Sequence, residues 1–90
     1  MKIRKWVEEI HPLDQGTTQY EVITDDGKHD MTIIKEWANC GNLSETVECS
    51  CGFYSYSQNG TGCWQHDHNT PVEHTFDDFH KRLYKKAVNS

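Results

Sequence analysis

Segments rich in β-branched and aromatic residues alternate with polar loops over the first two thirds of this 90-residue chain. An Asp-Asp-Gly-Lys turn at 25–28 separates two such segments and is typical of a tight β-hairpin. Asn- and Gly-rich residues at 38–45 predict a loop, as does 11–18. Short strands are therefore predicted over 2–10, 19–24, 29–37, 46–49 and 53–57.

The last segment, residues 75–88, has the pattern of a helix. Thr75 is the expected N-cap, acidic residues follow it, and basic residues come later, which complements the helix dipole. Apolar residues recur at the helical period at Phe76, Phe79, Leu83 and Ala87. The predicted fold is α+β: one domain over residues 1–90, a small antiparallel β-meander of four or five short strands followed by one C-terminal helix.

The composition predicts a small core that needs further support. Only 34% of the residues are hydrophobic, and the mean hydropathy is -0.87. Chains of this size often add disulfides or a metal to such a core. No apolar run resembles a signal peptide or a membrane span, so we expect a cytoplasmic protein without a membrane partner, whose thiols stay reduced. A metal therefore fits better than a disulfide framework.

Three of the four cysteines and three of the six histidines lie between Val47 and His74. In Cys49-Ser50-Cys51-Gly52, alternate residues of an extended chain point to one side, so both sulfurs can face one ion. Glycine can then take a positive φ and turn the chain sharply. Four Cys and His ligands in a tetrahedron are typical of structural zinc. The predicted Zn²⁺ ligands are Cys49, Cys51, Cys63 and His66.

The identity of the remaining ligands is left open by the spacing. His68 and His74 are alternates, and both together with Cys49 and Cys51 would make a second possible set without Cys63. Cys40 is expected to be a free, partly buried thiol and is the substitute ligand if one of the others fails. His80 is expected to be a surface or packing residue of the helix, and His11 and His29 carry no signal.

The segment CSCGFYSYSQNGTGCWQH resembles a SWIM-type zinc finger. That family places a Cys-x-Cys pair in a β-hairpin and a Cys-x-His pair at the start of a helix. Cys49, Cys51 and Cys63 match the family's cysteines, whereas this chain has Cys-x-x-His ending at His66. The resemblance implies a zinc-stabilised module that binds DNA or proteins and does not catalyse a reaction.

The motifs and the net charge together predict a binding protein with a protein partner and not an enzyme. The chain lacks the Gly-x-Ser-x-Gly, phosphate-loop and His-Glu-x-x-His motifs, so we do not expect an enzyme; a cysteine- or zinc-dependent enzyme using Cys63 and His66 is the third interpretation. The net charge of -5 favours a protein partner over nucleic acid, and predicts a protein-interaction or regulatory module. Weak nucleic-acid binding is the alternative, through the basic helix residues Lys81, Arg82, Lys85 and Lys86. The oligomeric state is not predicted.

Overall fold

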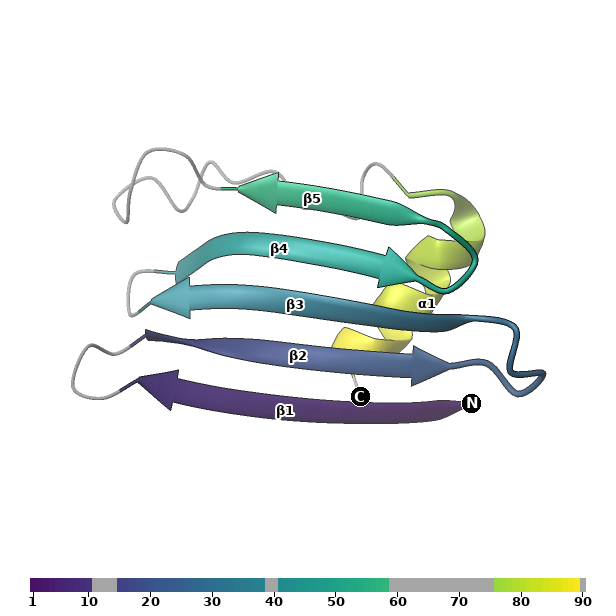
Figure 1. The fold of residues 1–90 in the computed structure, drawn as a ribbon, viewed down its shortest axis with the longest axis horizontal. Helices are drawn as coiled ribbons and strands as arrows, with labels where there is room; N and C mark the ends of the chain where they lie inside the picture. The colour runs from purple at the N-terminus through teal and green to yellow at the C-terminus, as the bar shows by residue number, and fades with distance from the viewer. Residues whose placement is uncertain (11–14, 39–40, 59–75, 90) are drawn as a thin grey trace.

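Five antiparallel strands and one helix make up the described part of this chain. The computed structural model describes residues 1–10, 15–38, 41–58 and 76–89. The elements are β1 (Lys2–Ile10), β2 (Gln15–Ile23), β3 (Asp30–Ala38), β4 (Gly41–Cys49), β5 (Tyr54–Gln58) and α1 (Asp78–Val88). Neighbours in sequence are neighbours in the sheet, in the order β1-β2-β3-β4-β5, and α1 lies against one face (Figure 1). The predicted α+β meander with a C-terminal helix is confirmed.

Two strands are longer than the sequence predicts. β4 begins at Gly41 and β2 at Gln15, so parts of the expected loops 38–45 and 11–18 belong to the sheet. The registers explain both extensions, because Gly41 pairs with Ala38 and Gln15 pairs with Ile10. Pairing with a neighbouring strand satisfies the backbone groups of these segments, and this outweighs the loop-like composition.

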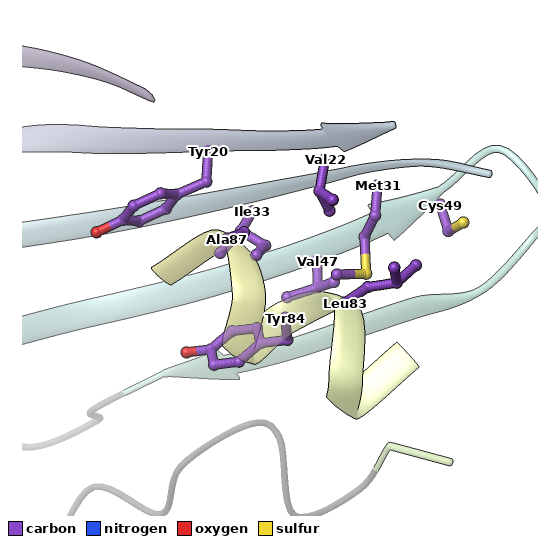
Figure 2. Packing of buried hydrophobic residues seen from close by; sticks show 9 residues of the cluster. All are labelled: Tyr20, Val22, Met31, Ile33, Val47, Cys49, Leu83, Tyr84 and Ala87. Atoms are coloured by element: carbon purple, nitrogen blue, oxygen red, sulfur yellow. The ribbon is translucent and has the colours of Figure 1, made fainter. Parts of the chain in front are cut away.

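The hydrophobic core lies between α1 and the face of the sheet that α1 covers. Alternate residues of β2, β3 and β4 point to this face, and one side of α1 packs on them (Figure 2). The buried hydrophobic residues are Tyr20, Val22, Met31, Ile33, Val47, Cys49, Leu83, Tyr84 and Ala87. The core thus holds few large aliphatic side chains, as the composition indicates. Within the described ranges, no helix has the length and apolarity that a membrane crossing requires.

The helix begins later than predicted and turns a different face to the sheet. Asp77, not Thr75, is the N-cap, because its carboxylate accepts a hydrogen bond of 2.8 Å from the backbone N–H of His80. Phe79 is 38% exposed, so the predicted apolar face is wrong at this position. The residues of α1 that are buried are His80, Leu83, Tyr84 and Ala87.

One acidic side chain is buried beside the core. Glu45 accepts a hydrogen bond from the hydroxyl of Tyr84, and its carboxylate lies 3.3 Å from Nζ of Lys35. The same Nζ lies 5.5 Å from the centre of the Tyr84 ring. The carboxylate is therefore compensated by a cation and a hydroxyl, which a buried charge requires.

We expect Ile33→Ala to lower the free energy of unfolding by about 2–5 kcal/mol, because the side chain of Ile33 on β3 is fully buried in the core beneath α1. Ile34→Ala is the matched control, since the next residue of the same strand points to the other face and is only partly buried. Its expected cost is about 1 kcal/mol or less. Urea denaturation of both variants under identical conditions measures the difference. Equal losses would contradict the assignment of the covered face.

Candidate metal centre

Four side chains with metal-binding atoms meet at one end of the sheet. His29 lies at the end of the β2–β3 turn, Cys49 and Cys51 lie at the β4–β5 turn, and His80 lies in the first turns of α1. Figure 1 shows both turns and the start of α1 at this same end. The two nitrogen and two sulfur ligand atoms all lie within 4.8 Å of one another.

The β4–β5 turn brings the two sulfurs together. Gly52 has φ 99°, a conformation that favours glycine, and the turn is closed by hydrogen bonds from N–H of Gly52 to the carbonyl of Cys49 (2.9 Å) and from N–H of Cys49 to the carbonyl of Phe53 (2.9 Å). The positive φ predicted for Gly52 is therefore present. Cys49 is buried, whereas Cys51 is exposed.

Ser50, between the two cysteines, joins this turn to the β2–β3 turn. Its backbone N–H donates to the carbonyl of Asp30 (3.1 Å), and its hydroxyl accepts from N–H of Asp30 (3.0 Å) and donates to the carbonyl of Lys28 (3.3 Å). The two turns are thereby held side by side. His29 is placed between Lys28 and Asp30, with Nδ1 3.6 Å from Sγ of Cys49.

The imidazole of His80 is buried and oriented from two sides. Its ring stacks on Phe53, with 4.1 Å between centroids and 10° between planes. Nδ1 lies 2.8 Å and 3.1 Å from the two carboxylate oxygens of Asp77. A carboxylate only accepts hydrogen bonds, so Nδ1 carries a hydrogen, and Nε2 is the nitrogen of the ring that is placed to ligate a metal. That Nε2 lies 3.2 Å from Sγ of Cys51.

The surroundings favour a charged Cys51 and a charged Asp77. A hydrogen bond from the backbone of Phe53, with further ones from His80, Cys49 and His29, lowers the pKa of the Cys51 thiol to about 6. Hydrogen bonds from the backbone and ring of His80 lower the pKa of the Asp77 carboxyl. Burial raises the pKa of the Cys49 thiol. In the metal-free chain, Cys51 is therefore the thiolate at neutral pH, and Cys49 loses its proton when a cation binds.

Two thiols and two imidazoles form a donor set suited to zinc. Tetrahedral zinc with ligand bonds of about 2.0–2.3 Å separates its ligand atoms by roughly 3.3–3.8 Å. The separations of 3.2 Å and 3.6 Å already fall near this range. Asp77 supplies the carboxylate behind a ligating imidazole that is usual in zinc sites. The cluster can therefore hold one metal ion through four protein ligands.

The structure brings together Cys49 and Cys51, as predicted, and adds two histidines that the sequence analysis did not select. His80 was expected to be a surface or packing residue; it is buried, and its Nε2 faces Cys51. The Asp-x-x-His spacing at the start of the helix was a usable signal for it. His29 had no local signal. The other candidates, Cys63, His66, His68 and His74, lie outside the described residues, as do Cys40 and His11.

Comparison with protein-family models, with curated proteins and with solved structures found no match to this chain. The likeness to SWIM-type fingers is therefore limited to the cysteine pattern. The case for a metal centre rests on the geometry of His29, Cys49, Cys51 and His80.

We predict that Asp77→Asn weakens zinc binding about 10–100-fold, the usual cost of losing the charge behind a ligating histidine. Asparagine is as good an N-cap as aspartate, so the helix should persist. Asp78→Asn, which removes the same charge from the next residue, is the control. Competition with a chromophoric chelator gives both affinities. Equal affinities for the two variants would show that Asp77 does not orient His80.

Cys51 and Cys49 should differ in their reaction with iodoacetamide when the metal is removed. Because the pKa of Cys51 is lowered to about 6, its alkylation rate should rise through that pH and level off above it. The pKa of Cys49 is raised, so its rate should still be rising at pH 9 and above. Mass spectrometry of the digested peptides separates the two. Similar pH profiles would contradict the hydrogen bonding at Cys51, and bound zinc should protect both residues.

Proposed function

We propose that this chain is a zinc-stabilised protein-binding module without catalytic activity. One Zn²⁺ is held by His29, Cys49, Cys51 and His80. The observation that carries the proposal is the convergence of four zinc-type donor atoms, from two turns and a helix, to within 4.8 Å.

The proposed ion has a clear structural task. An 11-residue helix is only marginally stable by itself, and the core beneath α1 is small. Zinc bound by four protein ligands contributes on the order of 10 kcal/mol of apparent binding free energy in small domains. Ligation by His80 ties α1 to the sheet, because the other three ligands belong to the two turns. The proposed zinc thus supplies folding stability that so small a core does not provide.

The donor set supports a structural ion over a catalytic one. Catalytic zinc keeps one position for water or substrate, whereas four protein ligands fill the tetrahedron. The proposed activity is therefore binding, with a regulatory role in the cytoplasm. A protein partner is favoured by charge, since residues 1–74 hold twelve acidic and five basic side chains and would repel a duplex. The exposed cations of α1, Arg82, Lys85 and Lys86, would give nucleic acid only a weak hold.

Elemental analysis of protein purified without chelator should find one zinc per chain, and ligand variants should identify where it binds. We expect Cys51→Ser, His29→Ala and His80→Ala to lose most of the zinc and to melt at a lower temperature. Cys63→Ser and His66→Ala should retain it, and Cys40→Ser is the thiol control. X-ray absorption should give two sulfur and two nitrogen ligands.

Two other results would change the proposal in different ways. Zinc loss in Cys63→Ser and His66→Ala, but not in His29→Ala and His80→Ala, would assign the ion to the Cys₃His set predicted from the sequence. If the purified protein carried no zinc and its melting temperature did not respond to chelator, both the proposed metal site and its structural role would be contradicted.

A further inference from the structure

The face of the sheet opposite α1 presents two tyrosines beside a glutamate. Val47 and Cys49 point toward α1, so Glu48 between them points away. Glu48 is paired with Tyr54 across β4 and β5, and Tyr56 follows on the same side of β5. Tyr54 and Tyr56 are 60% and 52% exposed. This face is turned toward the viewer in Figure 1, and no described helix or strand lies in front of it.

The same face already holds one guanidinium between a carboxylate and an aromatic ring. On β1, Nε of Arg4 donates to Glu21 at 3.0 Å, and its guanidinium lies 5.2 Å from the centre of the Trp6 ring. On the covered face, Lys35, Glu45 and Tyr84 repeat the arrangement with an ammonium. In both places, the chain's own cation completes a carboxylate–aromatic pair.

Glu48 and its two tyrosines offer the same groups without an internal cation. In the part of the chain that the structure describes, no lysine or arginine is paired with Glu48 or lies over Tyr54 or Tyr56. The other cross-strand neighbours on this face are uncharged, since Glu48 pairs with Thr32 of β3 and Tyr56 pairs with Thr46 of β4. A cation from outside would therefore meet a carboxylate and two ring faces with no competing positive charge.

We propose that Glu48, Tyr54 and Tyr56 bind an arginine side chain from a basic segment of a protein partner. The inference rests on the proposed binding function and specifies its partner. Arginine fits better than lysine, because a planar guanidinium can stack on a tyrosine while it donates two hydrogen bonds to a carboxylate. The net charge of -5 would draw a basic segment toward the molecule, and Glu48 would repel the phosphates of nucleic acid.

Fluorescence anisotropy with the zinc-loaded full chain tests this, using labelled oligo-arginine and oligo-lysine peptides of equal length. We expect oligo-arginine to bind about threefold or more tightly than oligo-lysine, and Glu48→Gln to weaken its binding about fivefold. Glu36→Gln is the matched control: it removes the same charge from the same face but is paired with Ser44, not an aromatic residue. Its effect should stay below about twofold. Tyr54→Leu with Tyr56→Leu should abolish the arginine preference.

Several outcomes would overturn the proposal. Equal losses in Glu48→Gln and Glu36→Gln would mean attraction by net charge alone. A preference for arginine that survives the loss of both tyrosines would place the site elsewhere. Failure of the wild-type chain to bind either peptide would contradict the proposed site altogether. Tyrosine-dependent binding of oligothymidylate in preference to oligo-arginine would make the surface a single-stranded nucleic-acid site. A measured content of one zinc per chain in every variant would show that none of these results comes from loss of the metal centre.

Discussion

The buried imidazole of His80 connects the start of α1 to the β4–β5 turn. Through Asp77 it belongs to the cap of α1, through the stack on Phe53 to the β4–β5 turn, and through Nε2 to Cys51. The helix needs such a link, since an isolated helix of 11 residues is marginal. A histidine can make all of these contacts at once, because its ring packs on Phe53 while its two nitrogens face Asp77 and Cys51.

Local patterns were enough to predict the architecture. The Asp-Asp-Gly-Lys turn forms, with Gly27 at φ 72°, and the β-branched segments around it become β2 and β3. Consecutive antiparallel strands need only short connections, so a sequence of strands and turns already implies a meander. The start of β4 was missed because Asn and Gly suit loops, and only pairing with β3 makes Gly41 part of a strand.

The candidate site was half predictable for a related reason. Cys49 and Cys51 are two residues apart, so their proximity could be predicted, although β4 ends at Cys49 and it is the turn after it, not strand alternation, that brings the two sulfurs together. His29 reaches Cys49 across 20 residues, and His80 reaches Cys51 across 29. Those approaches depend on the register of β3 and β4 and on which face α1 turns to the sheet. The helical period allowed Phe79 to point inward, and the Asp77 cap and Phe53 stack select His80 instead.

Strand β4 couples the metal centre to the surface on the other side of the sheet. Cys49 points to the candidate metal centre and Glu48 points away, so the two proposed functions would use alternate residues of one strand. Fixing Cys49 and Cys51 in a metal site would also fix the turn that leads into β5, and with it the position of Tyr54 relative to Glu48. A binding surface that is ordered before its partner arrives loses less conformational entropy on association. In this arrangement, the proposed zinc would stabilise the fold and prepare the surface through the same few residues.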